Sequence, residues 1–327
     1  MTLFSGIQPT GLLHIGNYFG AIKNWVKLQY KYPSIFCLVD YHAITISYDP
    51  KKMAKRILDL AIDLIACGIN PDKSILFVQS DIKEHPELTW ILSTITPLGD
   101  LKRMTQFKDK SKEHPENINA GLLSYPILMA ADILLYKAEV VPVGEDQLQH
   151  LEITREIARR FNKKYGRVFP EPKPILTPGA RVMSLTDPSK KMSKSYGPES
   201  YLALSDSAKT VYQKLSTAMT DPARKRKTDP GTPKKCSLYS LHQLVSEEKG
   251  LDYVSGGCAQ AEIGCLECKK LLAKNISKEL SPIQKRRKEL KKNPEKIKKI
   301  LAQGAERAEK IARKTMAEIK KKMGLNL

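Results

Sequence analysis

A segment near the start of the chain combines residue types that bind phosphate groups. In PTGLLHIGN, residues 9–17, His14 and Asn17 are three positions apart, so on a helix they share one face of the first turn. A helix that begins after the first strand of a parallel sheet also binds anions through its free N–H groups. Gly16 has no side chain and would let a flat purine approach the backbone. Because the dinucleotide fingerprint GxGxxG is absent, the segment predicts a mononucleotide site of another kind.

A second segment supplies the positive charge that such a site requires. KKMSKS, residues 190–195, places Lys191 and Lys194 on a serine-bearing loop. Two mobile ammonium groups that close over a triphosphate stabilise pyrophosphate as it leaves. A lysine–serine run alone is usually a solvated loop. Its meaning here depends on the upstream segment that contains His14.

A single carboxylate interrupts the most apolar helical segment. Asp132 lies in LLSYPILMAADILLY, residues 122–136, which is apolar nearly all round, as a buried helix is. A buried carboxylate without a donor is very costly, so a partner must donate to it. A core salt bridge with a lysine or arginine would satisfy it, and so would a ligand that carries a donor. A ligand whose ring carries an N–H donor suits the second interpretation, whereas a ring without a donor would leave the carboxylate unpaired.

Four of the six cysteines fall in one polar region. Cys236, Cys258, Cys265 and Cys268 follow the spacing C-x21-C-x6-C-x2-C. In an intracellular protein such a set favours a metal over disulfides. The spacing is compatible with zinc and with an iron–sulfur cluster. A third possibility is four thiols that bind no metal.

The elements that must position these residues alternate between strands and helices. Apolar runs predict buried strands at residues 2–6, 34–40, 74–80 and 138–144, and helical spacing predicts helices at 14–29 and 49–69. Asp49 is the expected N-cap of the second helix, with Pro50 in its first turn. The pattern predicts an α/β fold with a Rossmann-like, doubly wound parallel sheet.

After about residue 200 strand-like runs disappear, and the pattern predicts an all-helical C-terminal domain. The last helix is expected to start at Asn293 and to stop at Gly324. It carries an apolar stripe from Ile297 to Met323 that could pack back on the first domain. We expect domains at residues 1–190 and 201–327, joined by a mobile loop at 191–200.

Composition limits the class of protein. The net charge of +20, from 55 Lys+Arg and 35 Asp+Glu, suggests a polyanionic partner, usually nucleic acid. The basic stretch at residues 224–235 is a candidate for RNA backbone contacts. No apolar run reaches transmembrane length, and no signal peptide is recognisable. We therefore expect a cytoplasmic protein without a membrane partner.

These residues carry a resemblance to a known family. PTGLLHIGN and KMSKS resemble the two signature sequences of class I aminoacyl-tRNA synthetases. SGIQPTG, RMTQFK, LMAADILLY, VPVGEDQ and MSLTDPSKKMSKS resemble the tryptophanyl-tRNA synthetase family more closely. Asn17 stands where many class I relatives have a second histidine, but tryptophanyl enzymes commonly have asparagine there.

The resemblance implies a two-step reaction. Tryptophan would attack Mg·ATP to give tryptophanyl-adenylate and pyrophosphate, and the tRNA(Trp) 3′ end would then take the amino acid. It further implies a homodimer, a catalytic domain at 1–190 and an anticodon-binding domain at 201–327. Rival functions are a tyrosyl-tRNA synthetase, an adenylyltransferase of the same superfamily without tRNA, and a non-catalytic iron–sulfur nucleic-acid sensor.

The resemblance also implies roles for individual residues. Catalysis would use His14, Asn17, Lys191 and Lys194. ATP would contact Gln8, Pro9, Thr10, Gly16, Asn17, Gly144, Glu145, Asp146, Val182, Lys191, Met192, Ser193, Lys194 and Ser195. Tryptophan would contact Asp132 through its indole, and also Phe4, Gly6, His42, Tyr125, Met129, Val141, Val143 and Gln147. Some bacterial relatives hold a [4Fe–4S] cluster in a similar four-cysteine set, so the resemblance favours that cluster over zinc at Cys236, Cys258, Cys265 and Cys268.

Overall fold

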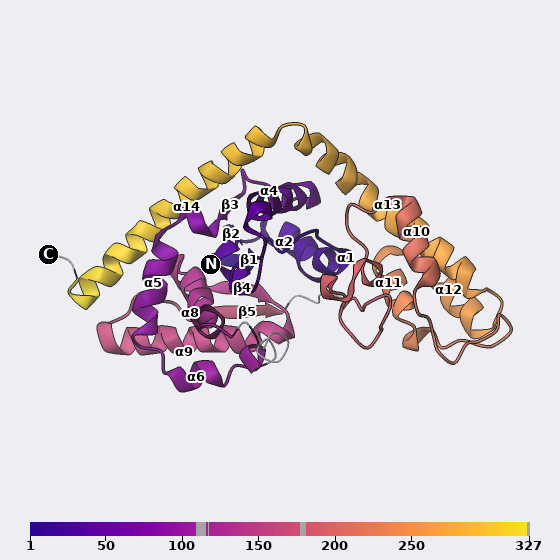
Figure 1. Ribbon diagram of the computed structural model, residues 1–327, viewed down its shortest axis with the longest axis horizontal. Helices are drawn as coiled ribbons and strands as arrows, with labels where there is room; N and C mark the ends of the chain where they lie inside the picture. Colours follow the sequence, from indigo (N-terminus) through magenta and orange to yellow (C-terminus); the bar gives the residue numbers. More distant parts are fainter. Residues whose placement is uncertain (109–115, 117, 177–180, 326–327) are drawn as a thin grey trace. The chain divides into compact units, whose positions relative to one another are not determined.

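The computed structural model describes residues 1–108, 116, 118–176 and 181–325 (Figure 1). The chain forms two compact units: unit 1 contains Met1–Gly11, Trp25–Thr177 and Asn293–Leu327, and unit 2 contains Leu12–Asn24 and Pro178–Lys292. The first signature segment is therefore divided between the units, and its residues from His14 to Asn17 belong with the lysine loop. The functional domains proposed above remain predictions, because compactness alone assigns no function.

Within the described residues, unit 1 is built on a five-stranded parallel sheet. The strands are β1 Leu3–Ile7, β2 Ser34–Leu38, β3 Ser74–Val78, β4 Val140–Val143 and β5 Lys173–Leu176, in the spatial order β3-β2-β1-β4-β5. The predicted Rossmann-like sheet is confirmed, with every neighbouring pair parallel. The sequence patterns miss β5, because this short edge strand is mostly exposed and contains Pro174.

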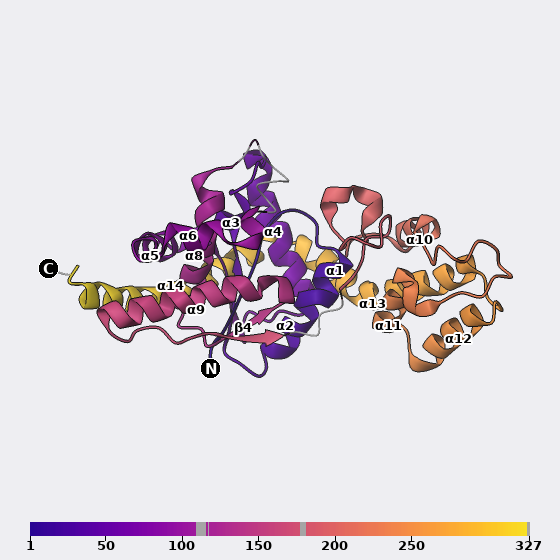
Figure 2. The same cartoon turned by 90° about the horizontal axis from the view of Figure 1, so that it is seen from below.

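Helices surround this sheet. They are α3 Asp40–Ala43, α4 Pro50–Cys67, α5 Glu84–Ser93, α6 Leu98–Lys102, α8 Ala120–Leu135, α9 Leu148–Tyr165 and α14 Pro294–Met323, with short 3-10 helices at Gln79–Asp81 and Glu145–Gln147. Figure 2 shows α9 lying beside the β4 side of the sheet, and α9 contacts β5. In the described part of the chain, no helix is both long enough and apolar enough to cross a membrane.

Both faces of the sheet are covered by apolar side chains. Phe4, Ile35 and Ile75 stand opposite one another on β1, β2 and β3, and they are buried in one cluster with residues of α5, α8, α9 and α14. On the opposite face Phe36 stacks on Trp25, with ring centroids 5.4 Å apart. Strands covered on both faces carry continuous apolar runs, which is why β2 and β3 are readable in the sequence.

The ends of the two long unit-1 helices follow from local chemistry. The side chains of Asp49 and Asn293 accept first-turn backbone N–H groups of α4 and α14, at 3.0 and 3.1 Å. Gly68 and Gly324 end these helices in the left-handed conformation, with φ of 115° and 71°. The predicted N-caps and the stop at Gly324 are confirmed. The helical spacing places Ile311 in the apolar stripe of α14. This residue is 36% exposed, so the prediction is wrong at this position.

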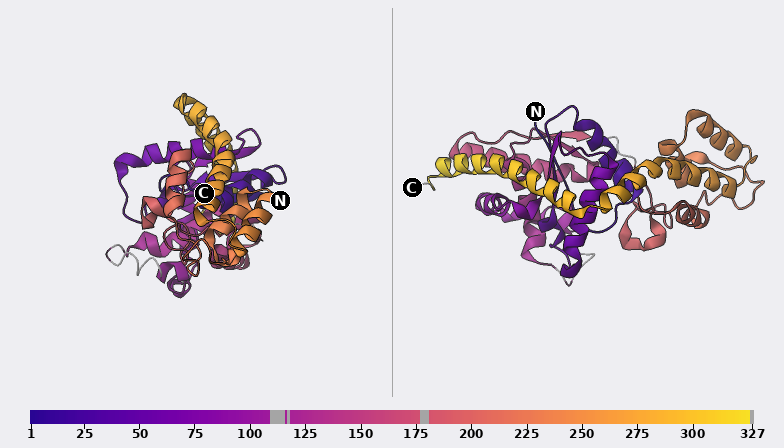
Figure 3. Two further views of the ribbon diagram at one scale, coloured as in Figure 1. Left: turned by 90° about the vertical axis from the view of Figure 1, so that its right-hand side faces the viewer. Right: turned by 90° about the horizontal axis from the view of Figure 1, so that it is seen from above.

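Helix α14 covers the free edge of the sheet at β3 (Figures 1 and 3). Gly304 lies directly on the strand, since a Cβ atom there would be 1.9 Å from the carbonyl oxygen of Leu76. Arg307 donates through Nη1 to the carbonyl oxygens of Pro71 and Ser74, at 3.0 and 3.3 Å. An uncovered edge strand presents unpaired backbone groups to other chains, and α14 removes that exposure.

The helix predicted at residues 14–29 contains a π-helical turn. α1 contains only Ile15–Asn17, a π-helix follows at Tyr18–Ile22, and α2 covers Lys23–Leu28. The predicted helix is confirmed from Ile15 to Leu28, with a π-helical turn in its middle that the spacing did not predict. A π-helical turn disturbs the regular hydrogen-bond ladder and is frequent near functional sites. Any phosphate-binding argument here must rest on side chains rather than on a long helix dipole.

Unit 2 is helical. Its main helices are α10 Ala208–Thr217, α11 Ser237–Val245, α12 Glu248–Ala259 and α13 Cys265–Lys291, with short 3-10 helices at Lys194–Tyr196, Pro198–Ser200 and Pro233–Lys235. Helix α13 packs against α10 and α11. Apart from isolated bridges, residues 181–292 contain no strand. The predicted helical C-terminal region is confirmed.

We expect Gly304→Ala to destabilise the protein by about 2 kcal/mol or more, because the new Cβ has no room against the β3 backbone. The usual effect of this change inside a helix has the opposite sign, a gain of about 0.5–1 kcal/mol. Gly256→Ala in α12 is the matched control, since no atom lies within 4 Å of its added Cβ. Urea unfolding of both variants measures the difference. Equal stability of Gly304→Ala and the parent protein would contradict the close approach.

Candidate active site

The HIGN segment is joined by backbone pairing to the chain that follows the lysine loop, within unit 2. The N–H of Ile15 donates to the carbonyl oxygen of Leu202 at 2.9 Å. The N–H of Leu204 donates to the carbonyl oxygen of Leu13, also at 2.9 Å. These bonds hold the start of α1 against the chain that follows the lysine loop. Two segments far apart in the sequence therefore lie together.

Gly16 allows a close approach of side chains at this point. A Cβ atom on Gly16 would lie 2.9 Å from the Cε1 and Nδ1 atoms of His14 and 3.6 Å from Cβ of Met192. The space beside Gly16 is thus filled by the protein's own imidazole ring. The absence of a side chain is explained by this contact without any purine.

The lysine loop is anchored by its central methionine. Met192 is buried, whereas its neighbour Lys191 is exposed. The N–H of Met192 donates to the carbonyl oxygen of Val182 at 2.9 Å. Farther along, the Ser200 hydroxyl donates to the carbonyl oxygen of Ser193 at 2.8 Å. This apolar anchor holds the backbone of the loop that carries Lys191 and Lys194.

His14 is buried beside these positive charges. Its backbone N–H donates to Oδ1 of Asn17 at 3.1 Å, and its Nδ1 atom has no hydrogen-bond partner among the described residues. Burial, followed by the charges of Lys194 and Lys191, lowers the pKa of His14 from 6.5 to about 4. The imidazole is therefore neutral at pH 7. Because its pKa lies below the unfolded value, the stability that it contributes is lost as the pH falls from about 6.5 to about 4.

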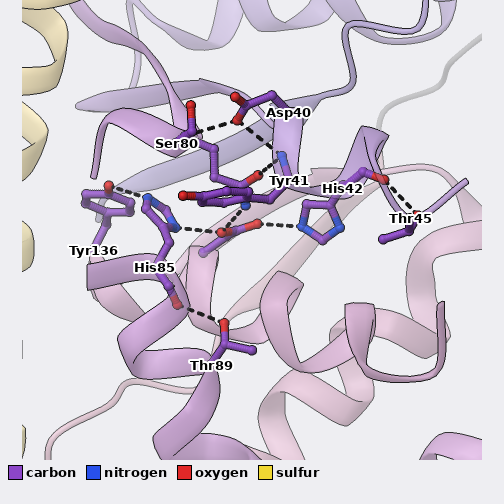
Figure 4. A network of polar contacts seen from close by, with 10 residues as sticks. Asp40, Tyr41, His42, Thr45, Ser80, His85, Thr89 and Tyr136 are labelled. Atoms are coloured by element: carbon purple, nitrogen blue, oxygen red, sulfur yellow. Dashed lines mark hydrogen bonds and ion pairs between the residues drawn. The ribbon is translucent and has the colours of Figure 1, made fainter. Parts of the chain in front are cut away.

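Asp132 accepts hydrogen bonds within a buried network in unit 1, of which Figure 4 labels His42, His85 and Tyr136. His85 donates from Nδ1 to its Oδ1 atom at 2.6 Å, and Gln79 donates to the same oxygen at 2.7 Å. His42 donates from Nε2 to Oδ2 at 2.8 Å. The side-chain donor required by the sequence is therefore found, but it comes from two histidines and a glutamine rather than from a lysine or arginine.

The network keeps Asp132 ionised and leaves it one acceptor position. Burial, the largest single influence, raises the pKa of Asp132, but the hydrogen bonds from His42 and His85 outweigh it and hold the pKa below its ordinary value. A carboxylate has about four acceptor positions, two on each oxygen. Oδ1 uses both of its positions and Oδ2 uses one. The remaining position on Oδ2 can accept one further donor.

Sequence reasoning missed two of the three donors. Gln79 directly follows β3, and the carboxyl ends of parallel strands are where α/β folds place ligands, so a signal for it existed. Its amide is oriented by the Tyr41 N–H, which donates to its Oε1 atom at 3.1 Å. His85 lies in the polar stretch EHPEL and gave no comparable signal. Only the packing of α5 against α8 brings it to Asp132.

The other residues predicted to contact tryptophan lie in unit 1 with Asp132. Phe4 stacks on Tyr136, with ring centroids 5.6 Å apart. The Tyr125 hydroxyl lies 2.8 Å from Nε2 of His150. The remaining members are the half-buried Met129 on α8, Val141 and Val143 on β4, Gly6 near the end of β1, and Gln147 just after β4. Their roles stay predictions.

Two of the predicted ATP-binding loops leave neighbouring strands of unit 1. Gln8, Pro9 and Thr10 follow β1, and Gly144 and Glu145 follow β4, which pairs with β1 in parallel. Both loops are therefore at the carboxyl edge of the sheet. The side chain of Asp146 lies outside the described part of the chain.

Comparison with known proteins places these features in a family. The model of the family "tRNA synthetases class I (W and Y)" matches residues 1–281. The tryptophan–tRNA ligase of Deinococcus radiodurans is 48% identical over 98% of this chain and 98% of its own, and that of Thermotoga maritima is 46% identical over 99% of each. The chain belongs to the class I tRNA synthetases, as a tryptophan–tRNA ligase.

A solved structure agrees with the sequence relatives. The crystal structure of tryptophanyl-tRNA synthetase from Campylobacter jejuni, complexed with ADP and tryptophan, has a TM-score of 0.87 to this chain at 37% identity. The match covers 99% of this chain and 100% of the other. The predicted activity of the enzyme and its class are thus confirmed. Its substrates are those of a synthetase: tryptophan, ATP and tRNA.

The four cysteines of this ligase gather in unit 2 without forming a recognisable metal site. Burial first, and then the proximity of the Cys236, Cys258 and Cys265 thiols, raises the pKa of Cys268 to about 12. The four sulfur atoms therefore lie within electrostatic range of one another. Among the described residues, however, no group of His, Cys, Asp or Glu side chains has the arrangement needed to hold a metal ion. The iron–sulfur site stays a prediction.

The basic stretch beside these cysteines is partly structural. Arg224 is buried, and it donates to Sγ of Cys258 at 3.4 Å and to the carbonyl oxygen of Lys227 at 2.9 Å. It is thus committed to the fold and is a poor candidate for RNA contact, unlike its exposed neighbours Lys225 and Arg226.

We expect Lys194→Ala to raise the pKa of His14 above its value of about 4, because one neighbouring positive charge is removed. Burial, the larger cause, remains, so the pKa should stay below 6.5. Titration of the His14 ring signals by NMR measures the change. Lys190→Ala is the control on the same loop, because Lys190 pairs with Asp187 at 3.2 Å. A His14 pKa that moves equally in both variants would argue against the specific proximity of Lys194.

Proposed function

We propose that His14, Asn17, Lys191 and Lys194 of this tryptophan–tRNA ligase bind the phosphates of ATP while tryptophan is activated. One observation carries the proposal: the HIGN segment is backbone-paired to the chain beside the lysine loop, and both lysines act electrostatically on His14. A buried neutral imidazole near two ammonium groups is an unfavourable place for a proton. A triphosphate at this point offsets the positive charge and accepts hydrogen bonds from all of these side chains.

The chemistry requires no protein nucleophile. The tryptophan carboxylate attacks the α-phosphorus of Mg·ATP, the bond between the α-phosphorus and the α,β-bridging oxygen breaks, and pyrophosphate leaves with the electron pair. Lys191 and Lys194 stabilise the charge on the leaving pyrophosphate. His14 and Asn17 orient the phosphates, so that catalysis is positioning together with charge stabilisation. In the second step the 3′-terminal adenosine hydroxyl of tRNA(Trp) attacks the acyl carbon of the adenylate, the bond from this carbon to the phosphate oxygen breaks, and AMP leaves.

Asp132 recognises the amino acid in this proposal. Its unused acceptor position on Oδ2 suits the indole N–H, which only donates. Phenylalanine has no donor on its ring and would leave this position unsatisfied. The bound tryptophan of the Campylobacter jejuni structure supports a tryptophan site in this fold. Phe4, Gly6, His42, Tyr125, Met129, Val141, Val143 and Gln147 line the amino-acid site in the same proposal.

The remaining ATP contacts follow the family pattern. We assign them to Gln8, Pro9, Thr10, Gly16, Gly144, Glu145, Asp146, Val182, Met192, Ser193 and Ser195, with Mg²⁺ entering as the partner of ATP. Val182 and Met192 are joined by a backbone hydrogen bond, so a change at either one alters the lysine loop. A homodimer and a cytoplasmic location complete the proposal on the strength of the family alone.

Lys194→Ala should slow adenylate formation by about 100-fold, while the tryptophan dissociation constant changes little. The charge of Lys194 acts on the leaving pyrophosphate, whereas the indole of tryptophan is bound by Asp132. Single-turnover kinetics measures the first quantity and equilibrium binding of tryptophan measures the second. Lys190→Ala again serves as the control and should leave both values unchanged. Equal losses of rate and tryptophan affinity in Lys194→Ala would remove the catalytic assignment.

We also propose that the four cysteines hold a [4Fe–4S] cluster, with zinc as the alternative. The chemistry of the donor set supports this: four thiols lie within electrostatic range, and Arg224 already donates to the Cys258 sulfur. Cys236, Cys258, Cys265 and Cys268 would be the ligands, and they would have to be deprotonated to bind. The group would join the starts of α11 and α13 to the end of α12. It would stabilise unit 2 and take no part in the reaction.

Anaerobically purified protein should absorb near 400 nm and contain about four iron atoms per chain, if the cluster is present. Replacement of Cys265 by serine should remove most of the absorbance and lower the thermal stability of unit 2. Cys67→Ser is the control, since Cys67 is buried in α4, far along the chain. Zinc in a colourless sample would select the alternative, and a sample without either metal would leave four free thiols.

A further inference from the structure

A relay of two buried side chains extends from Asp132 away from the proposed ligand position. His85 lies 2.6 Å from Oδ1 of Asp132 through its Nδ1 atom and 2.8 Å from the Tyr136 hydroxyl through its Nε2 atom (Figure 4). The side chain of His85 is fully buried, and Tyr136 is 3% exposed. None of the catalytic or substrate-binding roles proposed above uses either residue.

The direction of the hydrogen bonds follows from the chemistry of the three groups. In its neutral form the His85 ring carries one N–H, and the ionised Asp132 takes that N–H at Nδ1. Nε2 is then an acceptor, so the Tyr136 O–H donates to it. Burial raises the pKa of Tyr136 well above its ordinary value, which keeps the phenol protonated and able to donate. Tyr136 thus selects the His85 tautomer that faces Asp132 with a donor.

Aromatic packing holds the relay in place. The His85 ring stacks on Phe77, with centroids 5.9 Å apart. Phe77 also meets the Tyr136 ring edge to face at 5.8 Å, and Phe4 stacks on the other side of Tyr136 at 5.6 Å. Two rings fixed by packing, with hydrogen bonds at both ends, leave the imidazole little freedom to turn. The Asp132 carboxylate is therefore held in one plane by His85 and Gln79 on Oδ1 and by His42 on Oδ2.

We propose that His85 is a positioning residue and that Tyr136 fixes its tautomer, so that the open acceptor position on Oδ2 of Asp132 points toward a ring N–H of the substrate. The relay makes the enzyme select amino acids by the presence of that donor, beyond the shape of the ring. This inference rests on the proposed role of Asp132. A group with this function affects discrimination between two substrates of the same shape, whereas a merely structural group lowers the use of both substrates in proportion.

The test compares L-tryptophan with β-(3-benzothienyl)-L-alanine, in which sulfur replaces the indole N–H and the ring shape is kept. The readout is the ratio of the kcat/KM values for the two amino acids in ATP–pyrophosphate exchange. His85→Leu removes the donor to Asp132 and should lower the ratio about tenfold, the effect of one lost charge-assisted hydrogen bond. His85→Asn keeps an amide donor near the Nδ1 position and should restore part of the ratio.

Tyr136→Phe keeps the ring and its stacking but removes the hydroxyl. It should lower the ratio less than His85→Leu does, because only the tautomer preference is lost. Thr89→Ala is the control: it removes a hydroxyl that bonds the His85 carbonyl oxygen on α5 at 2.8 Å and leaves the relay intact. Its ratio should equal that of the parent enzyme. Tyr136→Phe also supplies the readout if His85→Leu yields no folded protein.

Asp132→Asn separates the two levels of the proposal. If it leaves the ratio at the parent value, Asp132 does not read the N–H, and the proposed amino-acid recognition fails. If it lowers the ratio while Tyr136→Phe and every folded His85 variant keep the parent value, recognition by Asp132 stands and the relay is overturned. A lower ratio in Tyr136→Phe and His85→Leu with partial recovery in His85→Asn supports the relay.

Discussion

The arrangement of several elements in unit 1 depends on one carboxylate, that of Asp132, which has almost no access to water. Asp132 can remain ionised only if its oxygens accept enough hydrogen bonds to offset the loss of solvation. Its donors come from α3, from the turn after β3 and from α5, while Asp132 itself lies on α8. Four elements must therefore meet at one point with hydrogen-bond precision. The same requirement leaves a single directed acceptor position, which is what a selective site for a ring N–H needs.

In unit 2 the functional charge is positive, whereas in unit 1 it is the negative charge of Asp132. In unit 2 the chain collects positive charge around a histidine that stays neutral because it is buried beside two lysines. The backbone pairing between the HIGN segment and residues 202–204 makes this arrangement part of the fold rather than an accident of a surface loop. One unit thus prepares a negative, precisely oriented acceptor, and the other prepares a positive region suited to phosphate. A synthetase needs both, because tryptophan presents a ring N–H donor and ATP presents negatively charged phosphates.

The sequence patterns were most accurate where local physics decides. Continuous apolar runs predicted β1 to β4, and the caps at Asp49 and Asn293 predicted where α4 and α14 begin. They were least accurate where neighbours decide. β5 is an exposed edge strand held by pairing with β4, and the helix after His14 contains a π-helical turn. Ile311 fits the helical stripe of α14, yet its side chain is partly exposed.

The sequence by itself determined the α/β class, the two signature segments, the need for a donor to Asp132 and, through resemblance, the ligase activity. Each of these depends on residue types and on spacings of a few positions, which can be read directly from the sequence. The tertiary structure alone decided that the donors are His42, Gln79 and His85, and that Tyr136 stands behind His85. It also decided that Gly304 serves the contact between α14 and β3. These partners are distant along the chain, and only the packing of whole helices on the sheet brings them within reach.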